Sequence, residues 1–406
     1  MLAALLTIFL TAPATLFAQD QEEMRGAPAE PADASEIRAQ MAVAENLLGK
    51  TPDRGAIFYF LAASKASLGE ILPAIQDLQK CVAFKEGFDP SGDSAFAAIK
   101  TSADFRHIVE EVHKDFPPVN ESHVAFTSVE KDIFPEGLEY DPGNDTLYMS
   151  SMYHPKVLKV GHDGKIDVFV PPARDHLLPV FGIRISPSDG TIWSASADED
   201  SGKSELLHFD RGGALLGRYP PAGNGKHIFN DLVVLRDGSV FLTDSLANVV
   251  YRFRAQDNSF TPLRVARSLL SPNGIALTED ETALYVADLL GVLRIDLKTG
   301  ASVDVDPGAH NTVAGIDGLY WRRGSLVAVQ NGIGTPRVVE FQLAADGLHV
   351  VRTTVFANSL TTPTTGALRG DDFYFITNGQ GDNLNGSHIM DVTRLQPVKI
   401  AVVHLP

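Results

Sequence analysis

Residues 271–288 read SPNGIALTEDETALYVAD, and this stretch decides the fold. An Asn-Gly pair precedes a short apolar strand, a polar turn follows, and a second apolar strand ends in Asp288. Short strands separated by Gly, Asp and Asn turns predict antiparallel β-structure. The same plan returns in residues 134–151, 180–198, 229–245, 315–332 and 364–379.

The six stretches repeat at near-regular intervals. Their matching positions are 43 to 49 residues apart in sequence, and they are Gly137, Gly182, Asp231, Gly274, Gly318 and Gly366. A period of roughly 40–50 residues with four strands per unit is typical of a β-propeller. The sequence therefore predicts a mainly β fold, with a six-bladed propeller over residues 121–406. We expect the strand at 123–129 to complete the last blade, which would close the ring and remove its open edges.

A helical period occupies residues 36–116, ahead of the repeats. The passage FLAASKASLGEILPAIQDLQKCVAFKEGFDP (60–90) resembles a tetratricopeptide repeat, with Ala62, Gly69, Ala74 and Cys81 at its small positions. We interpret Cys81 as a core residue. Because a lone repeat cannot bury its apolar face, this module should pack on neighbouring helices or on the propeller. A protein partner held by the module is a further expectation.

The N-terminus has the composition of an export leader. Residues 1–18 are apolar and end in Leu-Phe-Ala, which predicts a cleaved signal peptide, and residues 19–35 read as a linker. Pro13 interrupts the apolar run, so we expect no membrane span in the mature chain. The protein should be periplasmic or secreted.

The 406 residues carry a formal net charge of −17. This charge disfavours nucleic acid and anionic lipid as partners and is compatible with binding of cations.

Oxygen-bearing side chains recur where the innermost strand of each blade should begin. They are Glu136, Asn230, Asn273 and Asp317, and we assign the remaining two places to Gly182 and Thr365. These strands converge on one mouth of the central channel. Carboxylate and amide oxygens in a ring suit a hard divalent cation, foremost Ca²⁺, whereas the lack of Cys and His in the ring disfavours zinc and copper.

The motifs PEG (135–137), FND (229–231), SPNG (271–274) and IDG (316–318) resemble, in blade order, those of the gluconolactonase and regucalcin family of six-bladed propellers. The resemblance covers about residues 130–390. It implies hydrolysis of lactones with a divalent metal held by Glu136, Asn273 and Asp317. It places Asn230 beside the substrate or as a further ligand, and it makes Asp317 the expected general base.

Other candidate residues come from departures from this pattern. Where the family often has an arginine before the third-blade asparagine, this chain has Ile228, preceded by His227. A His-Pro pair resembling that of the paraoxonases makes His154 a candidate second base or proton shuttle. His227, Asp231 and Asp288 are candidate substrate-binding residues together with Asn230, although an aspartate that ends a strand also caps turns.

Two functions from different classes follow. The first is an exported metal-dependent hydrolase, a lactonase or related esterase, acting on a small-molecule lactone or ester. The chain has no GxSxG motif for a serine nucleophile, which favours attack by water. The alternative is a non-catalytic propeller that binds or scaffolds other proteins, with a structural calcium ion that stabilises the native state.

Overall fold

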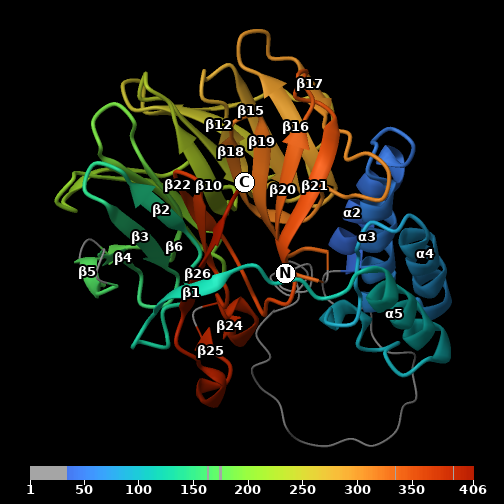
Figure 1. Ribbon diagram of the computed structural model, residues 1–406. Coiled ribbons are helices and arrows are strands. Elements are labelled where there is room, and N and C mark those ends of the chain that lie inside the picture. The colour runs from blue at the N-terminus through green and yellow to red at the C-terminus, as the bar shows by residue number, and fades with distance from the viewer. Residues whose placement is uncertain (1–33, 162–163, 173–175, 334, 387) are drawn as a thin grey trace, which may run out of the picture.

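The computed structural model describes residues 34–406, except 162–163, 173–175, 334 and 387. The predicted signal peptide lies outside the described residues, as does the predicted linker up to residue 33. The described chain forms six four-stranded antiparallel sheets arranged as a propeller, with four α-helices near the N-terminus (Figure 1). The predicted six-bladed, mainly β fold is confirmed.

Each of the first five blades is a meander of consecutive strands. Blade one is β2 (Leu138–Asp141), β3 (Thr146–Ser151), β4 (Lys156–Val160) and β5 (Ile166–Val170). Blade two is β6 (Val180–Ile185), β7 (Ile192–Asp198), β8 (Lys203–Phe209) and β9 (Leu215–Tyr219). Blade three is β10 (Phe229–Val234), β11 (Val240–Asp244), β12 (Val249–Arg254) and β13 (Ser259–Pro262). Blade four is β14 (Ile275–Leu277), β15 (Ala283–Asp288), β16 (Gly291–Asp296) and β17 (Ser302–Asp304). Blade five is β18 (Ile316–Arg322), β19 (Ser325–Gln330), β20 (Arg337–Leu343) and β21 (Val350–Ala357).

Blade six joins the two ends of the propeller. It consists of β22 (Gly366–Arg369), β23 (Asp372–Ile376), β26 (Lys399–His404) and β1 (His123–Thr127), and β1 pairs antiparallel with β26. The expected closure by the first strand is therefore confirmed. Six apolar clusters hold the ring together, each between two neighbouring sheets, such as Phe181 and Trp193 of blade two against Phe229 and Leu232 of blade three.

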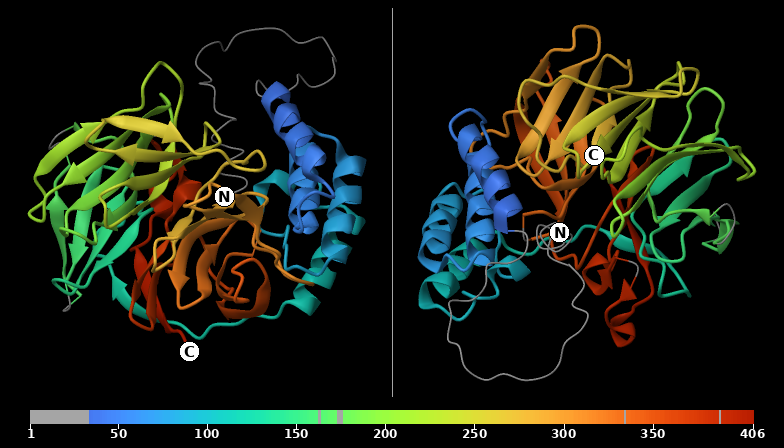
Figure 2. Two further views of the ribbon diagram at one scale, coloured as in Figure 1. Left: turned by 90° about the horizontal axis from the view of Figure 1, so that it is seen from above. Right: turned by 180° about the vertical axis from the view of Figure 1, so that it is seen from behind.

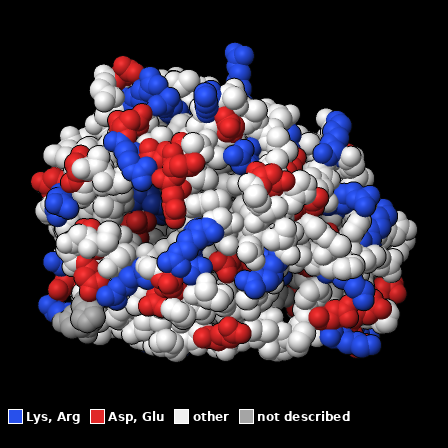
Figure 3. Space-filling model, turned by 45° about the horizontal axis from the view of Figure 1, so that its top comes forward, with Lys and Arg blue, Asp and Glu red and all other residues white. Residues whose placement is uncertain are grey.

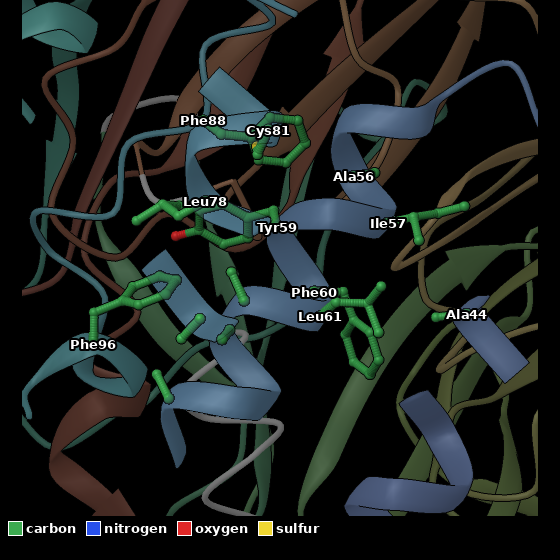
Figure 4. Close-up of a cluster of buried hydrophobic side chains, with 14 of the residues drawn as sticks. Ala44, Ala56, Ile57, Tyr59, Phe60, Leu61, Leu78, Cys81, Phe88 and Phe96 are labelled. Atoms are coloured by element: carbon green, nitrogen blue, oxygen red, sulfur yellow. The ribbon is translucent and has the colours of Figure 1, made fainter. Parts of the chain in front are cut away.

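The helices are α2 (Ala34–Leu47), α3 (Arg54–Ser67), α4 (Ile71–Ala83) and α5 (Ala103–Asp115). Helix α3 starts at Asp53, whose side chain accepts the Ala56 backbone N–H, and ends before Gly69, which has a positive φ of 77°. Helices α3 and α4 pack on each other as a hairpin around Tyr59, Leu78 and Cys81 (Figure 4). Cys81 is a buried core residue, as expected. The resemblance of this helical hairpin to a tetratricopeptide repeat stays a prediction.

The module packs beside blades four and five (Figure 2). Its core continues into Leu270, Leu290, Ala314 and Ile333 of the propeller. These residues lie in loops at the end of the blades where the innermost strands begin. The propeller of the same chain thus covers the apolar face of the helical module, one of the two packings expected from the sequence.

A two-stranded hairpin, β24 (Leu384–Asn385) and β25 (His388–Ile389), is inserted between β23 and β26 at the same end of the propeller (Figure 1). Gln380 Nε2 donates to the Lys131 carbonyl over 2.9 Å, and the Gly386 backbone lies against the Asp200 side chain of blade two. The hairpin and the helical module therefore flank the same end of the channel.

The surface carries both signs of charge. Basic and acidic side chains alternate over the face drawn in Figure 3, so the net charge of −17 forms no single acidic surface there. Among the described residues, no helix has the length and hydropathy required to cross a bilayer.

A buried acid in the module gives a pH-dependent prediction. Glu86 is 6% exposed, its Oε2 has no hydrogen-bond partner, and burial, followed by the Asp53 charge, raises its pKa to about 9. This pKa lies above that of an unfolded glutamate. The contribution of Glu86 to the free energy of unfolding is therefore most favourable below about pH 4.5 and falls as the pH rises toward 9. Glu86→Gln should therefore raise the melting temperature at pH 8 by on the order of 2 °C or more and change it little at pH 5. Calorimetry at both pH values checks this, and an equal shift at both would contradict it.

Candidate active site

The innermost strands β2, β6, β10, β14, β18 and β22 meet closely at the channel mouth. The Asp317 carbonyl lies so near Gly274 that a Cβ there would be 2.6 Å from the oxygen, and a Cβ on Gly182 would be 2.7 Å from the Asn230 carbonyl. Gly137 lies in the same way against the Phe181 carbonyl. The recurring glycine is thus a packing requirement between neighbouring blades. Gly182 therefore corresponds to Gly137 and Gly274, each of which follows a ring residue. The blade-two place in the ring belongs to Phe181, and its assignment to Gly182 is wrong.

Glu136 and Asp317 bring two buried carboxylates to this mouth. Their exposed fractions are 5% and 1%. Burial raises the pKa of Glu136 well above its ordinary value, and the charges of Asp317, Glu199 and Asp231 raise it further. Burial also raises the pKa of Asp317 to about 7, against the neighbouring amides of Asn331 and Asn273, which lower it. The negative charge of Asp317 thus acts on Glu136 at the same mouth.

Asp317 and Asn273 each present one buried oxygen that no hydrogen bond in the described chain satisfies. Asn331 Nδ2 donates to Asp317 Oδ2 over 2.6 Å, whereas Asp317 Oδ1 and Asn273 Oδ1 are buried without a hydrogen-bond partner. Asn230 Nδ2 donates to Ser245 Oγ over 3.1 Å, so this bond uses the nitrogen of the amide and not its oxygen. Unpaired buried oxygens beside carboxylates are what a cation would complete.

The donor set fits a hard cation only when the amides take part. Within the described ranges, no three His, Cys, Asp or Glu side chains are close enough to hold a metal ion by themselves. The candidate ligands are therefore Glu136, Asp317 and the amide oxygens of Asn230 and Asn273, a set made of oxygen alone.

Asp231 points away from free solvent and into a buried ion pair. Arg184 Nη2 lies 2.9 Å from Asp231 Oδ2, and Arg184 Nη1 lies 3.7 Å from Glu139 Oε2. The guanidinium also stacks over Tyr320, 5.4 Å from the ring centroid. Sequence reasoning missed Arg184, and the only signal was an arginine inside the apolar strand VFGIRI. These contacts favour a structural role for Asp231.

His227 and Asp288 lie at strand ends with partners of their own. His227 Nδ1 lies 2.6 Å from Asp244 Oδ2, and the other Asp244 oxygen accepts the backbone N–H of Ile228. Asp288 pairs with Arg267 and accepts the backbone N–H of Leu270 and Leu290. Asp244 orients the His227 ring, and the carboxylate of Asp288 is held by these contacts within the blade.

His154 lies in the turn between β3 and β4, at the same end of the blade as Glu136. Its side chain is 57% exposed, its Nε2 is 4.0 Å from Asp132, and its ring packs edge-on against Tyr153. Glu199, in the turn between β7 and β8, was not singled out from the sequence, yet its charge acts on Glu136. Burial, then Asp200 and Asp198, raise the pKa of Glu199 to about 7.

Similarity of this chain to known proteins is found among solved structures. No protein-family profile and no curated protein matches it. Among solved structures, a gluconolactonase from Xanthomonas campestris is 19% identical, with 72% of this chain and 96% of that chain covered and a TM-score of 0.49. Virginiamycin B lyase from Staphylococcus aureus is 19% identical over 63% and 81%, with a TM-score of 0.46. The PQQ-bound aldose sugar dehydrogenase from Streptomyces coelicolor is 16% identical over 70% and 99%, with a TM-score of 0.47. At this identity the likeness is one of fold alone.

Proposed function

We propose that this chain is an exported, calcium-dependent hydrolase that opens a lactone or a related ester at the propeller mouth. The observation that carries the proposal is the pair of buried carboxylates, Glu136 and Asp317, beside amide oxygens, with Asn273 Oδ1 and Asp317 Oδ1 left without partners. A scaffold would have no need for two repelling acids in the same mouth.

Glu136, Asn230, Asn273 and Asp317 would hold the cation. When bound, a calcium ion supplies polarisation of the ester carbonyl and stabilises the negative charge that develops on its oxygen. Oxygen-only ligands favour calcium over zinc or copper. Of these side chains, Asn230 is also placed by Ser245 to donate or accept toward a substrate.

Asp317 is the candidate general base. Its Oδ1 is buried without a hydrogen-bond partner and can accept a proton there. It would take a proton from the attacking water while the water oxygen bonds to the carbonyl carbon, and then release that proton to the leaving oxygen as the ring C–O bond breaks. Asn331 Nδ2 holds Oδ2 and leaves Oδ1 to do this. His227, oriented by Asp244, and the exposed His154 are the candidate groups for substrate contact and proton exchange at the rim.

The assay is hydrolysis of a panel of lactones and aryl esters by the purified protein, with calcium and again after chelation by EGTA. We expect turnover with calcium and loss of at least about 90% of it after chelation, restored by added calcium. Absence of turnover in both states would overturn the proposal. If calcium then still raised the melting temperature, the alternative of a non-catalytic propeller with a structural ion would stand.

A further inference from the structure

A buried chain of hydrogen bonds joins the helical module to the strand that carries Asp317. Thr312 Oγ1 donates to Asp53 Oδ2 over 2.7 Å, and the Val313 backbone N–H donates to the same oxygen over 2.9 Å. The other oxygen of Asp53 accepts the Ala56 N–H at the start of α3. One carboxylate therefore fixes both the first turn of a helix and residues 312–315, the loop that leads directly into β18.

The same loop is held from the propeller side. Gln330 Nε2 donates to the carbonyls of Thr312, over 3.1 Å, and Ala314, over 2.6 Å. Arg337 Nε in turn donates to Gln330 Oε1 over 2.6 Å. The next residue along the chain, Asn331, donates to Asp317 Oδ2. Both supports of the loop thus converge on Asp317, only four residues beyond Val313.

Docking of the module does not by itself require this carboxylate. The apolar contact with Leu270, Leu290, Ala314 and Ile333 already joins the module to the blades. Asp53 is 1% exposed, and burying a carboxylate is costly unless hydrogen bonds satisfy it, so the bonds from Thr312 and Val313 are needed to keep Asp53 in this place. Its partners on the propeller lie in this loop.

We propose that the helical module is a fixed part of the active site, in which Asp53 is a positioning residue for Asp317. The inference rests on the proposed function, because that function gives Asp317 its role. Asp53 touches neither substrate nor cation; it acts through Thr312 and Val313. Supporting groups of this kind typically change metal affinity or activity by roughly 10- to 100-fold when they are removed.

The chain offers a matched control in Asp89. This aspartate also bridges module and propeller, since its N–H donates to the Ile333 carbonyl over 2.9 Å and its Oδ2 accepts from Thr335 Oγ1 over 3.0 Å. Its side-chain partner on the propeller, Thr335, lies outside residues 312–315, at the end of the β19–β20 turn away from Asn331, and Asp89→Asn keeps the backbone bond to Ile333. Asp53→Asn and Asp89→Asn should therefore loosen the same interface, and only the first should release the loop before Asp317.

The experiment uses the full-length chain and two readouts. Isothermal titration with CaCl₂ should give an affinity about tenfold weaker for Asp53→Asn and within about twofold of wild type for Asp89→Asn. Hydrogen exchange of peptides covering 312–318 should become faster in Asp53→Asn alone. Equal effects of the two variants, or no effect of Asp53→Asn on either readout, would overturn the inference. If Asp53→Asn does not fold, Thr312→Val, which removes one of the two donors, takes its place with the same criteria.

The two readouts separate this inference from the proposed function. If the wild-type chain binds no calcium and hydrolyses no ester, the proposed function fails. Exchange at 312–318 then still decides whether Asp53 positions the segment: faster exchange in Asp53→Asn alone supports the positioning role, and unchanged exchange overturns it.

Discussion

Asp317→Asn is expected to abolish calcium-dependent hydrolysis, lowering kcat/KM by at least about 10³-fold, while the protein stays folded. An amide cannot take the proton of the attacking water, and loss of a general base alone costs about 10²- to 10⁴-fold. The exchange also removes one negative charge from the ligands of the cation, which should weaken calcium binding. Because burial already raises the pKa of Asp317 to about 7 in the calcium-free chain, a neutral group at this site should cost no stability at neutral pH when calcium is absent. Steady-state kinetics and the melting temperature at pH 7 check both parts.

Asp141 provides the control for this variant. It is a buried aspartate on the innermost strand of blade one, at the far end of that strand from the mouth, and its Oδ1 accepts the Gly143 N–H over 2.8 Å. Asp141→Asn should keep wild-type turnover. Retained hydrolysis in Asp317→Asn would remove the assignment of Asp317 as the base, and an equal loss in Asp141→Asn would point to a general effect on folding.

The blades could be predicted because their signal is local and repeated. Gly137, Gly182, Gly274 and Gly318 recur where adjacent innermost strands touch, and Gly366 lies against β23 of its own blade, so close packing imposes a period on the sequence. In blade three Asp231 replaces the glycine, and its carboxylate accepts a hydrogen bond from Arg184. The acids and amides of the mouth precede these positions, which is why the same period indicated the candidate site.

The contacts that support the site could not be predicted, because they join residues that are distant in sequence. Thr312 lies 259 residues from Asp53, and nothing near either residue encodes the pairing. The helical period predicted a module with an unpaired apolar face but gave no information on which blades cover it. Asn331, which holds Asp317, reads in the sequence as part of an ordinary Asn-Gly turn.

The repeat also could not separate structural from functional carboxylates. Asp244 and Asp288 end equivalent strands, yet one orients His227 and the other is held by Arg267. Both follow the same local pattern, and only the partner distinguishes them. Glu199 could not be predicted for a related reason. It lies in a turn, and its charge acts on Glu136 only because blades one and two are side by side in the fold.

Arg184→Met should lower the free energy of unfolding by about 3–5 kcal/mol at pH 8. The substitution keeps an unbranched chain over Tyr320 but leaves Asp231 and Glu139 without their buried counter-charge. Burial raises the pKa of Glu139 to about 7, and Arg184 opposes that rise, so the variant should hold the proton to higher pH. Since a raised folded-state pKa makes stability fall as the pH rises, the deficit should be smaller at pH 5 than at pH 8. Urea unfolding at both pH values measures it.

Two further variants show whether charge or packing carries this effect. Arg236 is an exposed arginine 3.2 Å from Glu281, and Arg236→Met should cost less than about 1 kcal/mol because water screens that pair. Adding Asp231→Asn to Arg184→Met removes the nearer of the two uncompensated carboxylates and should recover a substantial part of the loss. If the double variant is no more stable than Arg184→Met, the stacking of the guanidinium on Tyr320, and not its ion pairs, holds this part of the channel together.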